Sequence, residues 1–120
     1  MAAKDDLGRV GEQRAAAYLS DRGYDVLDRN WRCPAGEVDI VASRAGLLCV
    51  VEVKTRTSLR FGHPFEALDD RKVRRLWHLA HAWIDAHPGR AVHSRVRLEA
   101  IGIIGPDPRS GMLEHLVDLR

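Results

Sequence analysis

The chain has 120 residues, of which 45% are hydrophobic and 30% are charged, and its formal net charge at pH 7 is +2. This length suits one domain, so we expect a single domain over residues 1–120. The composition excludes an intrinsically disordered chain, and no apolar run reaches membrane-spanning length. Polar residues begin at Lys4, and no apolar secretory core follows. We therefore expect a cytoplasmic protein with no membrane partner.

The positive charge is concentrated in one segment. Residues 54–75 contain seven basic and three acidic residues, so this window carries +4 while the rest of the chain carries −2. The basic residues are Lys54, Arg56, Arg60, Arg71, Lys72, Arg74 and Arg75. Such a segment favours a polyanionic partner such as nucleic acid. A solvated helix face would give the same pattern, and charge alone does not separate the two.

Hydrophobic spacing and turn residues predict the order α-β-β-β-α-β-β. The expected elements are a helix over 7–19, strands over 24–30, 37–42 and 47–54, a helix from 65 to near 88, and strands over 95–104 and 113–119. Long loops are expected over 55–64 and 105–111. This order predicts an α/β domain with one mixed sheet and helices packed against it.

The residues that can carry chemistry lie in the second and third predicted strands. Side chains alternate between the faces of a strand, so Glu37 and Asp39 share one face, and Glu52 and Lys54 share one face of the next strand. The third strand is apolar on both faces before Glu52, which indicates a central, doubly covered strand. The short connection around Gly46 makes the two strands an antiparallel hairpin.

The register of this hairpin decides whether the carboxylates meet. Opposed residues in an antiparallel pair have numbers with a constant sum. A sum of 91 places Asp39 opposite Glu52 with Cβ atoms about 5 Å apart, and a sum of 89 places them diagonally, about 7–8 Å apart. Either sum puts Lys54 on the same face. Crowded carboxylates repel each other unless a cation lies between them, which points to Mg²⁺ or Mn²⁺. The alternative is an ordinary ion pair at a solvated strand end.

Several motifs together resemble a known family. They are Gly11-Glu12, Asn30-Trp31, Gly36-Glu37-Val38-Asp39, Val51-Glu52-Val53-Lys54-Thr55-Arg56, and Phe61-Gly62 followed by Lys72. This set resembles the YraN-like uncharacterised bacterial family over nearly the whole chain. That family is assigned to the PD-(D/E)xK superfamily, which includes Holliday junction resolvases and restriction enzymes. The resemblance implies a restriction-endonuclease-like three-layer domain, with a central mixed β-sheet flanked by helices.

The resemblance also implies roles for individual residues. Asp39 and Glu52 would be metal ligands and Lys54 the catalytic lysine. Glu12 matches an acidic residue that some resolvase-like members add to the metal shell, although a glutamate early in a helix is also favoured by the helix dipole. Val38 replaces the superfamily's proline, which leaves the aspartate in place. Arg97-Leu98-Glu99 stands where the family tends to have Arg-Phe-Asp, so we assign no role to Glu99.

The remaining candidates would act around this centre. Glu37 shares a face with Asp39 and is expected just outside the metal's direct contacts, with a solvated side chain as the alternative. Phosphate contacts are expected from Lys54, Arg56, Arg71, Lys72, Arg74 and Arg75, and the outer face of a helix is the alternative for those after residue 70. Trp31 could stack on a base, but core packing is the preferred interpretation.

These observations favour a metal-dependent nuclease that hydrolyses phosphodiester bonds in DNA or branched nucleic acid, with Mg²⁺ or Mn²⁺ as cofactor. Two alternatives remain open: a non-catalytic nucleic-acid-binding module of the same fold, and a protein-interaction domain. The expected partner is nucleic acid, with DNA preferred, and a homodimer is compatible with the sequence.

Overall fold

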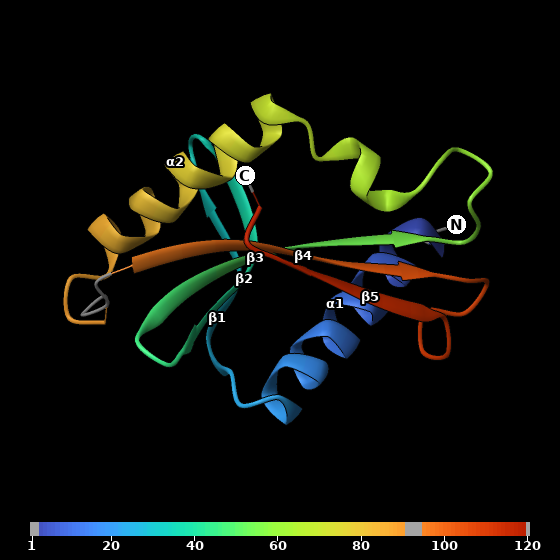
Figure 1. Ribbon diagram of the computed structural model, residues 1–120, viewed down its shortest axis with the longest axis horizontal. Helices are drawn as coiled ribbons and strands as arrows, with labels where there is room; N and C mark the ends of the chain where they lie inside the picture. The colour runs from blue at the N-terminus through green and yellow to red at the C-terminus, as the bar shows by residue number, and fades with distance from the viewer. Residues whose placement is uncertain (1–2, 91–94, 120) are drawn as a thin grey trace.

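A five-stranded mixed sheet forms the middle layer of the structure, and one long helix covers each of its faces (Figure 1). The computed structural model describes residues 3–90 and 95–119. The elements are α1 (Ala3–Asp21), β1 (Asp25–Cys33), β2 (Gly36–Arg44), β3 (Leu47–Arg56), the 3₁₀ helix η1 (Pro64–Ala67), α2 (Asp70–Ala86), β4 (Arg95–Ile104) and β5 (Met112–Val117). This confirms the predicted α/β order and the three-layer restriction-endonuclease-like arrangement. None of the described helices is long and apolar enough to cross a membrane.

The strands lie side by side in their order along the chain, from β1 to β5. Strands β1, β2 and β3 form an antiparallel meander, β3 and β4 are parallel, and β4 and β5 are antiparallel. A parallel pair needs a crossover connection, and here α2 provides it. The crossover lays α2 over one face of β3, while α1 covers the opposite face (Figure 1).

Strand β3 is buried on both faces, as its apolar sequence predicts. All six residues from Leu48 to Val53 are buried. Leu48 and Val50 belong to the hydrophobic cluster under α2, whereas Val51 and Val53 belong to the cluster under α1. Glu52, the first charged residue of the strand, is therefore buried in the interior of the molecule.

The predicted helix from Phe65 is two helices, so this prediction was wrong at its start. Pro64 begins the short helix η1, and Leu68 interrupts it with a non-helical backbone. Asp69 then starts α2 anew, because its Oδ1 accepts a hydrogen bond from the Lys72 backbone N–H at 2.9 Å. Side-chain capping of this kind satisfies an N–H that the first turn would leave unpaired.

Strand β1 continues beyond its predicted end at Asn30 and reaches Cys33. Asn30 has a φ of 53°, which breaks the expected strand pattern without ending the pairing with β2. Trp31 consequently lies in the strand rather than in a loop, and it packs half-buried against the hydrophobic cluster under α2. The preferred interpretation of Trp31 as a core residue is confirmed. The last strand is shorter than predicted and ends at Val117.

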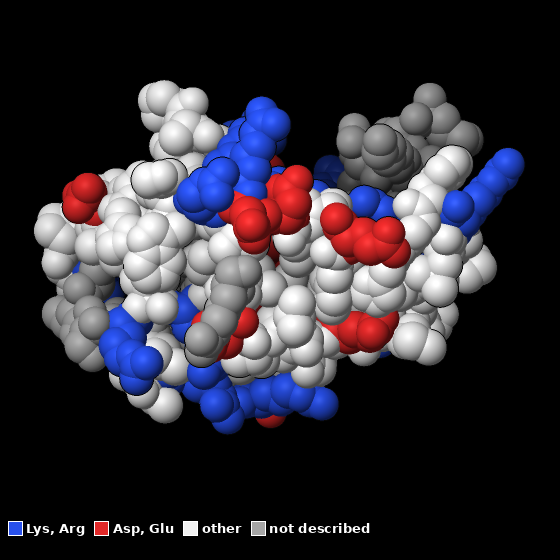
Figure 2. Space-filling model, turned by 45° about the horizontal axis from the view of Figure 1, so that its top comes forward, with Lys and Arg blue, Asp and Glu red and all other residues white. Residues whose placement is uncertain are grey.

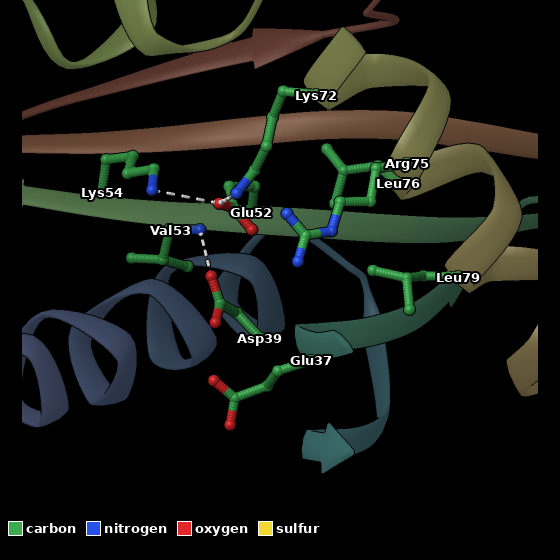
Figure 3. A pocket seen from close by; sticks show the side chains of 9 residues that line it. All are labelled: Glu37, Asp39, Glu52, Val53, Lys54, Lys72, Arg75, Leu76 and Leu79. Carbon is green, nitrogen blue, oxygen red and sulfur yellow. Dashed lines mark hydrogen bonds and ion pairs between the residues drawn. The ribbon is translucent and has the colours of Figure 1, made fainter. Parts of the chain in front are cut away.

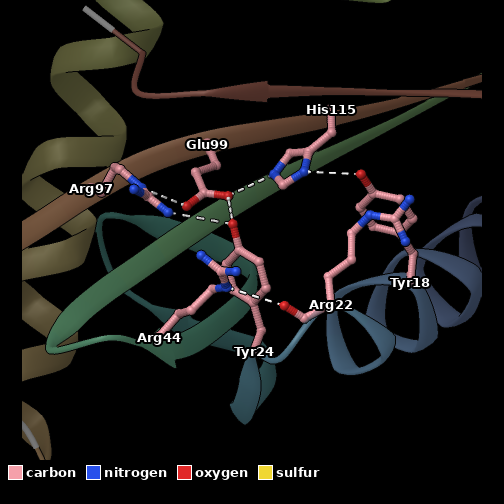
Figure 4. Close-up of polar contacts among 7 residues, drawn as sticks. All are labelled: Tyr18, Arg22, Tyr24, Arg44, Arg97, Glu99 and His115. Atoms are coloured by element: carbon pink, nitrogen blue, oxygen red, sulfur yellow. Dashed lines mark hydrogen bonds and ion pairs between the residues drawn. The ribbon is translucent and has the colours of Figure 1, made fainter.

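A buried polar cluster around Glu99 ties α1 to the far strands of the sheet (Figure 4). Glu99 on β4 is fully buried. Its Oε1 accepts hydrogen bonds from the Tyr24 hydroxyl at 2.9 Å and from Nε2 of His115 at 2.6 Å, and its Oε2 accepts one from Arg97 Nε at 2.9 Å. Nδ1 of His115 lies 3.2 Å from the Tyr18 hydroxyl on α1. The cluster thus joins α1, β4 and β5 through one carboxylate.

Hydrogen bonds keep Glu99 ionised despite its burial. Burial raises its pKa, but hydrogen bonds from His115, Tyr24, Cys49 and Arg97 outweigh this effect and lower the pKa to about 2. Burial, together with the charge of Glu99, raises the pKa of Cys49 to about 12. The Cys49 thiol is therefore protonated near neutral pH and is not a nucleophile.

We predict that Glu99→Gln destabilises the protein by about 3–5 kcal/mol at pH 7, because it removes one partner from a buried, paired cluster. The lowered pKa stabilises the folded state above the unfolded-state pKa of about 4.3, and this contribution is lost as the pH falls toward 2. The difference in the free energy of unfolding between variant and wild type should therefore shrink as the pH falls from 4 to 2. Urea unfolding across this range measures it.

The exposed Asp107–Arg109 pair provides the control for this experiment. Asp107→Asn changes the same chemical group at the surface, where an ion pair contributes little. If Asp107→Asn and Glu99→Gln destabilise the protein equally, the structural role assigned to the Glu99 cluster is incorrect.

Candidate functional site

A polar cleft lies between the end of the β2–β3 hairpin and the first turns of α2 (Figure 3). It has a volume of about 280 Å³. Carboxylates, basic groups and apolar side chains line it: Glu37, Asp39, Glu52, Val53, Lys54, Lys72, Arg75, Leu76 and Leu79. The cleft thus contains all three residues that the sequence assigned to the chemistry, together with two basic residues from α2.

The hairpin register brings Asp39 and Glu52 together. Ile40 lies opposite Val51 and the next pairs keep the same sum of 91, one of the two sums that place both carboxylates on one face. Continuing this register places Asp39 opposite Glu52. Beyond the last paired residues, the Asp39 side chain replaces the backbone as acceptor: its Oδ2 accepts a hydrogen bond from the Val53 N–H at 2.8 Å. Asp39 is therefore fixed against β3 by its own carboxylate.

Two lysines converge on the Glu52 carboxylate from different elements. Glu52 is only 6% exposed. Its Oε2 lies 3.3 Å from Nζ of Lys54 on the same strand and 3.2 Å from Nζ of Lys72 on α2. The guanidinium of Arg75 points toward the same cavity (Figure 3). A buried carboxylate needs such compensation because isolated charges are costly to remove from water.

The pKa of Asp39 responds in the opposite direction from that of Glu99. Burial and the negative charge of Glu52 raise the pKa of Asp39 to about 8, and the hydrogen bond from Val53 offsets this only in part. The charge of Glu12 adds to the increase. Without further positive charge, Asp39 therefore retains its proton near neutral pH, and a cation bound beside Glu52 would displace that proton.

Glu12 lies near the cleft but does not line it. It lines an adjoining cavity. The pKa of Glu12 is raised, mainly by burial and also by the charges of Glu37 and Glu52, although a hydrogen bond from Asn30 opposes this increase. The place of Glu12 is set by close packing of α1 on β3, since a Cβ on Gly11 would come within 2.2 Å of Thr55 Oγ1. Within residues 3–90 and 95–119, no three His, Cys, Asp or Glu side chains gather around one possible metal position.

The basic segment divides among separate places in the fold. Lys72 and Arg75 face the cleft, Arg56 lines the adjoining cavity, and Arg71 and Arg74 are exposed on α2 outside both. Figure 2 shows basic and acidic side chains interspersed over one face, with no continuous basic stripe on that face. Of the residues expected to contact phosphate, Lys54, Lys72 and Arg75 therefore lie at the cleft and Arg56 lies beside it.

Asp39 lies between Glu52 and Glu37 (Figure 3). Glu37 lines both the cleft and the adjoining cavity. Its Oε2 accepts a hydrogen bond from Arg32 Nε at 3.0 Å. Arg32, Arg9 and Asn30 also line the adjoining cavity, and sequence reasoning did not select them for a site. They come from α1 and β1, so only the packing of those elements against β3 reveals their position.

A family model matches residues 11–103, which include every residue at the centre of the cleft. The chain belongs to the uncharacterised protein family UPF0102. A UPF0102 protein of Renibacterium salmoninarum is 46% identical to this chain over 116 residues, covering 97% of each chain. A UPF0102 protein of Paenarthrobacter aurescens is 48% identical over 116 residues, covering 97% of this chain and 94% of its own. UPF0102 membership is consistent with the family resemblance of the motifs, and it assigns no reaction.

We predict that Asp39→Asn stabilises the metal-free protein at high pH. The pKa of Asp39 is about 3.9 in the unfolded chain and is raised to about 8 in the folded protein. The proton on Asp39 therefore contributes its full stabilisation below pH 4, and this contribution is lost as the pH rises toward 8. Asparagine does not ionise and can still accept the hydrogen bond from Val53. The Tm of the variant in EDTA should match wild type near pH 4 and exceed it at pH 8, by the equivalent of about 1 to a few kcal/mol.

Thermal unfolding at closely spaced pH values tests this prediction. Asp85→Asn on the exposed side of α2 serves as the matched control and should follow wild type throughout. A Tm for Asp39→Asn that stays below wild type at pH 8 would show that the carboxylate stabilises the metal-free fold.

Proposed function

We propose that this UPF0102 protein is a divalent-metal-dependent nuclease of the PD-(D/E)xK superfamily that hydrolyses phosphodiester bonds in DNA or branched nucleic acid. The observation that carries the proposal is the convergence of Asp39, Glu52 and Lys54 in one cleft at the end of a doubly buried strand. Carboxylates that repel each other at a buried position destabilise a fold, and such sites are often retained for function.

The donor set fits Mg²⁺ or Mn²⁺. These hard cations prefer oxygen ligands, and Mg²⁺ usually takes one or two carboxylates and completes its shell with water and substrate phosphate. Asp39 and Glu52, with the Val53 carbonyl, would hold the ion. The ion would lower the pKa of a bound water and compensate the charge on the reacting phosphate. The Lys54 and Lys72 ammonium groups beside Glu52 already mark the cleft as a place that attracts positive charge.

The basic residues of the cleft would position the substrate. Lys54 lies at the same carboxylate as the proposed ion, so its ammonium can orient the attacking water or contact the phosphate. Lys72 and Arg75 reach the cleft from α2, on the other side of Glu52 (Figure 3). Planar guanidinium groups bind phosphate in a bidentate manner, which suits Arg75 for holding non-bridging phosphate oxygens.

Two observations favour a second candidate, a non-catalytic nucleic-acid-binding module. Lys72 already neutralises Glu52 from within the chain, and Glu12 does not complete a group of three ligands with Asp39 and Glu52 in the described part of the chain. In that case the cleft would bind phosphate through Lys54, Lys72 and Arg75 without a metal. Metal binding and cleavage distinguish the two candidates.

We predict that the protein binds Mn²⁺ at one site and that Glu52→Gln weakens this binding at least about tenfold. Changes in residues that merely support a metal ligand already cost about 10–100-fold in affinity, and Glu52 is proposed as a direct ligand. Isothermal titration calorimetry of wild type and variant provides the measurement, with Asp85→Asn as a surface carboxylate control. Equal binding by wild type and Glu52→Gln would remove Glu52 from the ligand set.

The cleavage experiment uses linear, flapped and four-way-junction DNA, and RNA of the same sequences, with Mn²⁺, Mg²⁺ or EDTA. We predict Mn²⁺-dependent cleavage by the wild type and a loss of about a hundredfold or more in Lys54→Ala, with binding largely retained, because Lys54 acts mainly on the transition state. Binding without cleavage under all these conditions would favour the binding module.

Two neighbouring arginines on α2 give a matched comparison in the same assay. Arg75→Gln removes a charge from the cleft, whereas Arg74→Gln removes the same charge from the exposed surface outside it. We expect the first variant to lose cleavage activity and the second to retain it. Equal losses would indicate that long-range charge, rather than position in the cleft, explains the effect.

A further inference from the structure

A second, larger cavity continues from the cleft along α1 and the ends of β1 and β3. Its volume is about 1060 Å³, and it shares Glu37, Val53 and Lys54 with the cleft. The remaining lining residues are Leu7, Gly8, Arg9, Glu12, Asn30, Arg32, Thr55, Arg56, Thr57 and Phe61. A ligand that occupies this groove therefore reaches Lys54, and through it the proposed reaction centre.

The charge of the groove suits a phosphate backbone. Four basic side chains line it, Arg9, Arg32, Lys54 and Arg56, against two carboxylates, Glu12 and Glu37. In the described part of the chain, Arg56 makes no ion pair; its Nη1 reaches only the Thr55 carbonyl, at 3.4 Å. A positive groove is the part of a nucleic-acid site that follows the backbone.

Phe61 at the edge of this groove is an unusual aromatic residue. Its side chain is 88% exposed, more than any other large hydrophobic side chain described. The guanidinium of Arg60 lies 5.6 Å from the centroid of this ring, and the ring is otherwise open to a flat ligand at the edge of the basic groove. Every nucleic-acid base has a flat face that can stack on such a ring.

The loop that carries Phe61 is held in place on both sides. In the turn that contains it, the Gly62 N–H donates to the Leu59 carbonyl at 2.9 Å, and Gly62 has a φ of 96°, which favours glycine. After it, the His63 N–H donates to Glu66 Oε2 at 2.9 Å, and Nε2 of His63 lies 2.6 Å from Oε2 of Glu114 on β5. The ring is thus presented by a braced turn, which lowers the entropy lost on binding.

We propose that the groove binds an unpaired nucleic-acid strand, with a base stacked on Phe61 and backbone phosphates at Arg9, Arg32 and Arg56, and guides that strand to the cleft. Within a duplex, neighbouring base pairs cover the flat faces of each base, so a ring at the edge of the groove favours bases in single-stranded regions. The inference rests on the proposed nuclease function and narrows its substrate to strands with an unpaired segment, such as a flap or a splayed branch.

Binding in EDTA tests the inference without any cleavage. Fluorescence anisotropy compares a labelled oligothymidylate with a blunt duplex of the same length, and circular dichroism confirms that each variant is folded. Phe61→Ala should weaken single-strand binding about five- to hundredfold, because stacking contributes about 1–3 kcal/mol per base, and should leave duplex binding nearly unchanged. Phe61→Trp should retain wild-type affinity or exceed it.

Leu59→Ala is the matched control, because Leu59 is a 56% exposed apolar residue of the same turn that does not line the groove. It should bind both probes as wild type does. Three results would overturn the inference: no effect of Phe61→Ala, an equal loss for single strand and duplex, or an equal loss in Leu59→Ala. These results leave the Mn²⁺-dependent cleavage assay to decide the nuclease function separately. Conversely, a stacking effect without cleavage would retain the groove and reject the nuclease.

Discussion

Burial of strand β3 on both faces decides where polar chemistry can occur in this protein. Helix α1 covers one face and α2 the other, so a charged residue in the strand is removed from bulk water. Glu52 occupies such a position, and its neighbour Asp39 is brought opposite it by the hairpin register. Lys54 and Lys72 supply positive charge at the Glu52 carboxylate, and the raised pKa of Asp39 further limits the repulsion near neutral pH. A cleft with mixed charge at the end of an apolar strand is the result.

The pKa values of Glu99 and Asp39 are shifted in opposite directions. Glu99 receives hydrogen bonds from several donors, and its pKa falls to about 2, so its charge is fully compensated. Asp39 faces another carboxylate, and its pKa rises to about 8, so its charge is not compensated. The first arrangement is complete without a ligand and joins α1 to β4 and β5. The second would be completed by an added cation, which is why we propose the chemistry there and not at Glu99.

The arrangement of the two cavities suggests a division of work within one continuous surface. The cleft contains the groups proposed to act on a phosphodiester, and the adjoining groove has a basic lining and the exposed ring of Phe61. Lys54 lines both, so a strand bound in the groove would reach the proposed reaction centre. In this proposal, preference for an unpaired strand would arise from stacking in the groove.

The sequence by itself determined the order of elements, the buried central strand and the pair of strands that carries Asp39, Glu52 and Lys54. These follow from local periodicity, from the short turn around Gly46 and from the constant sum of an antiparallel register, all of which act over a few residues. The start of α2 was misjudged because the capping hydrogen bond that the Asp69 side chain accepts from the Lys72 N–H outweighs the helical spacing of the apolar residues before it.

Only the tertiary structure decided which distant residues share the site. Lys72 and Arg75 meet the carboxylates because the crossover between β3 and β4 lays α2 over that face, whereas Arg71 and Arg74, one position away in each case, point elsewhere. The groove with Phe61 forms where α1, β1 and the loop after β3 pack together. Contacts of this kind join residues far apart in the chain, and no local pattern in the sequence encodes them.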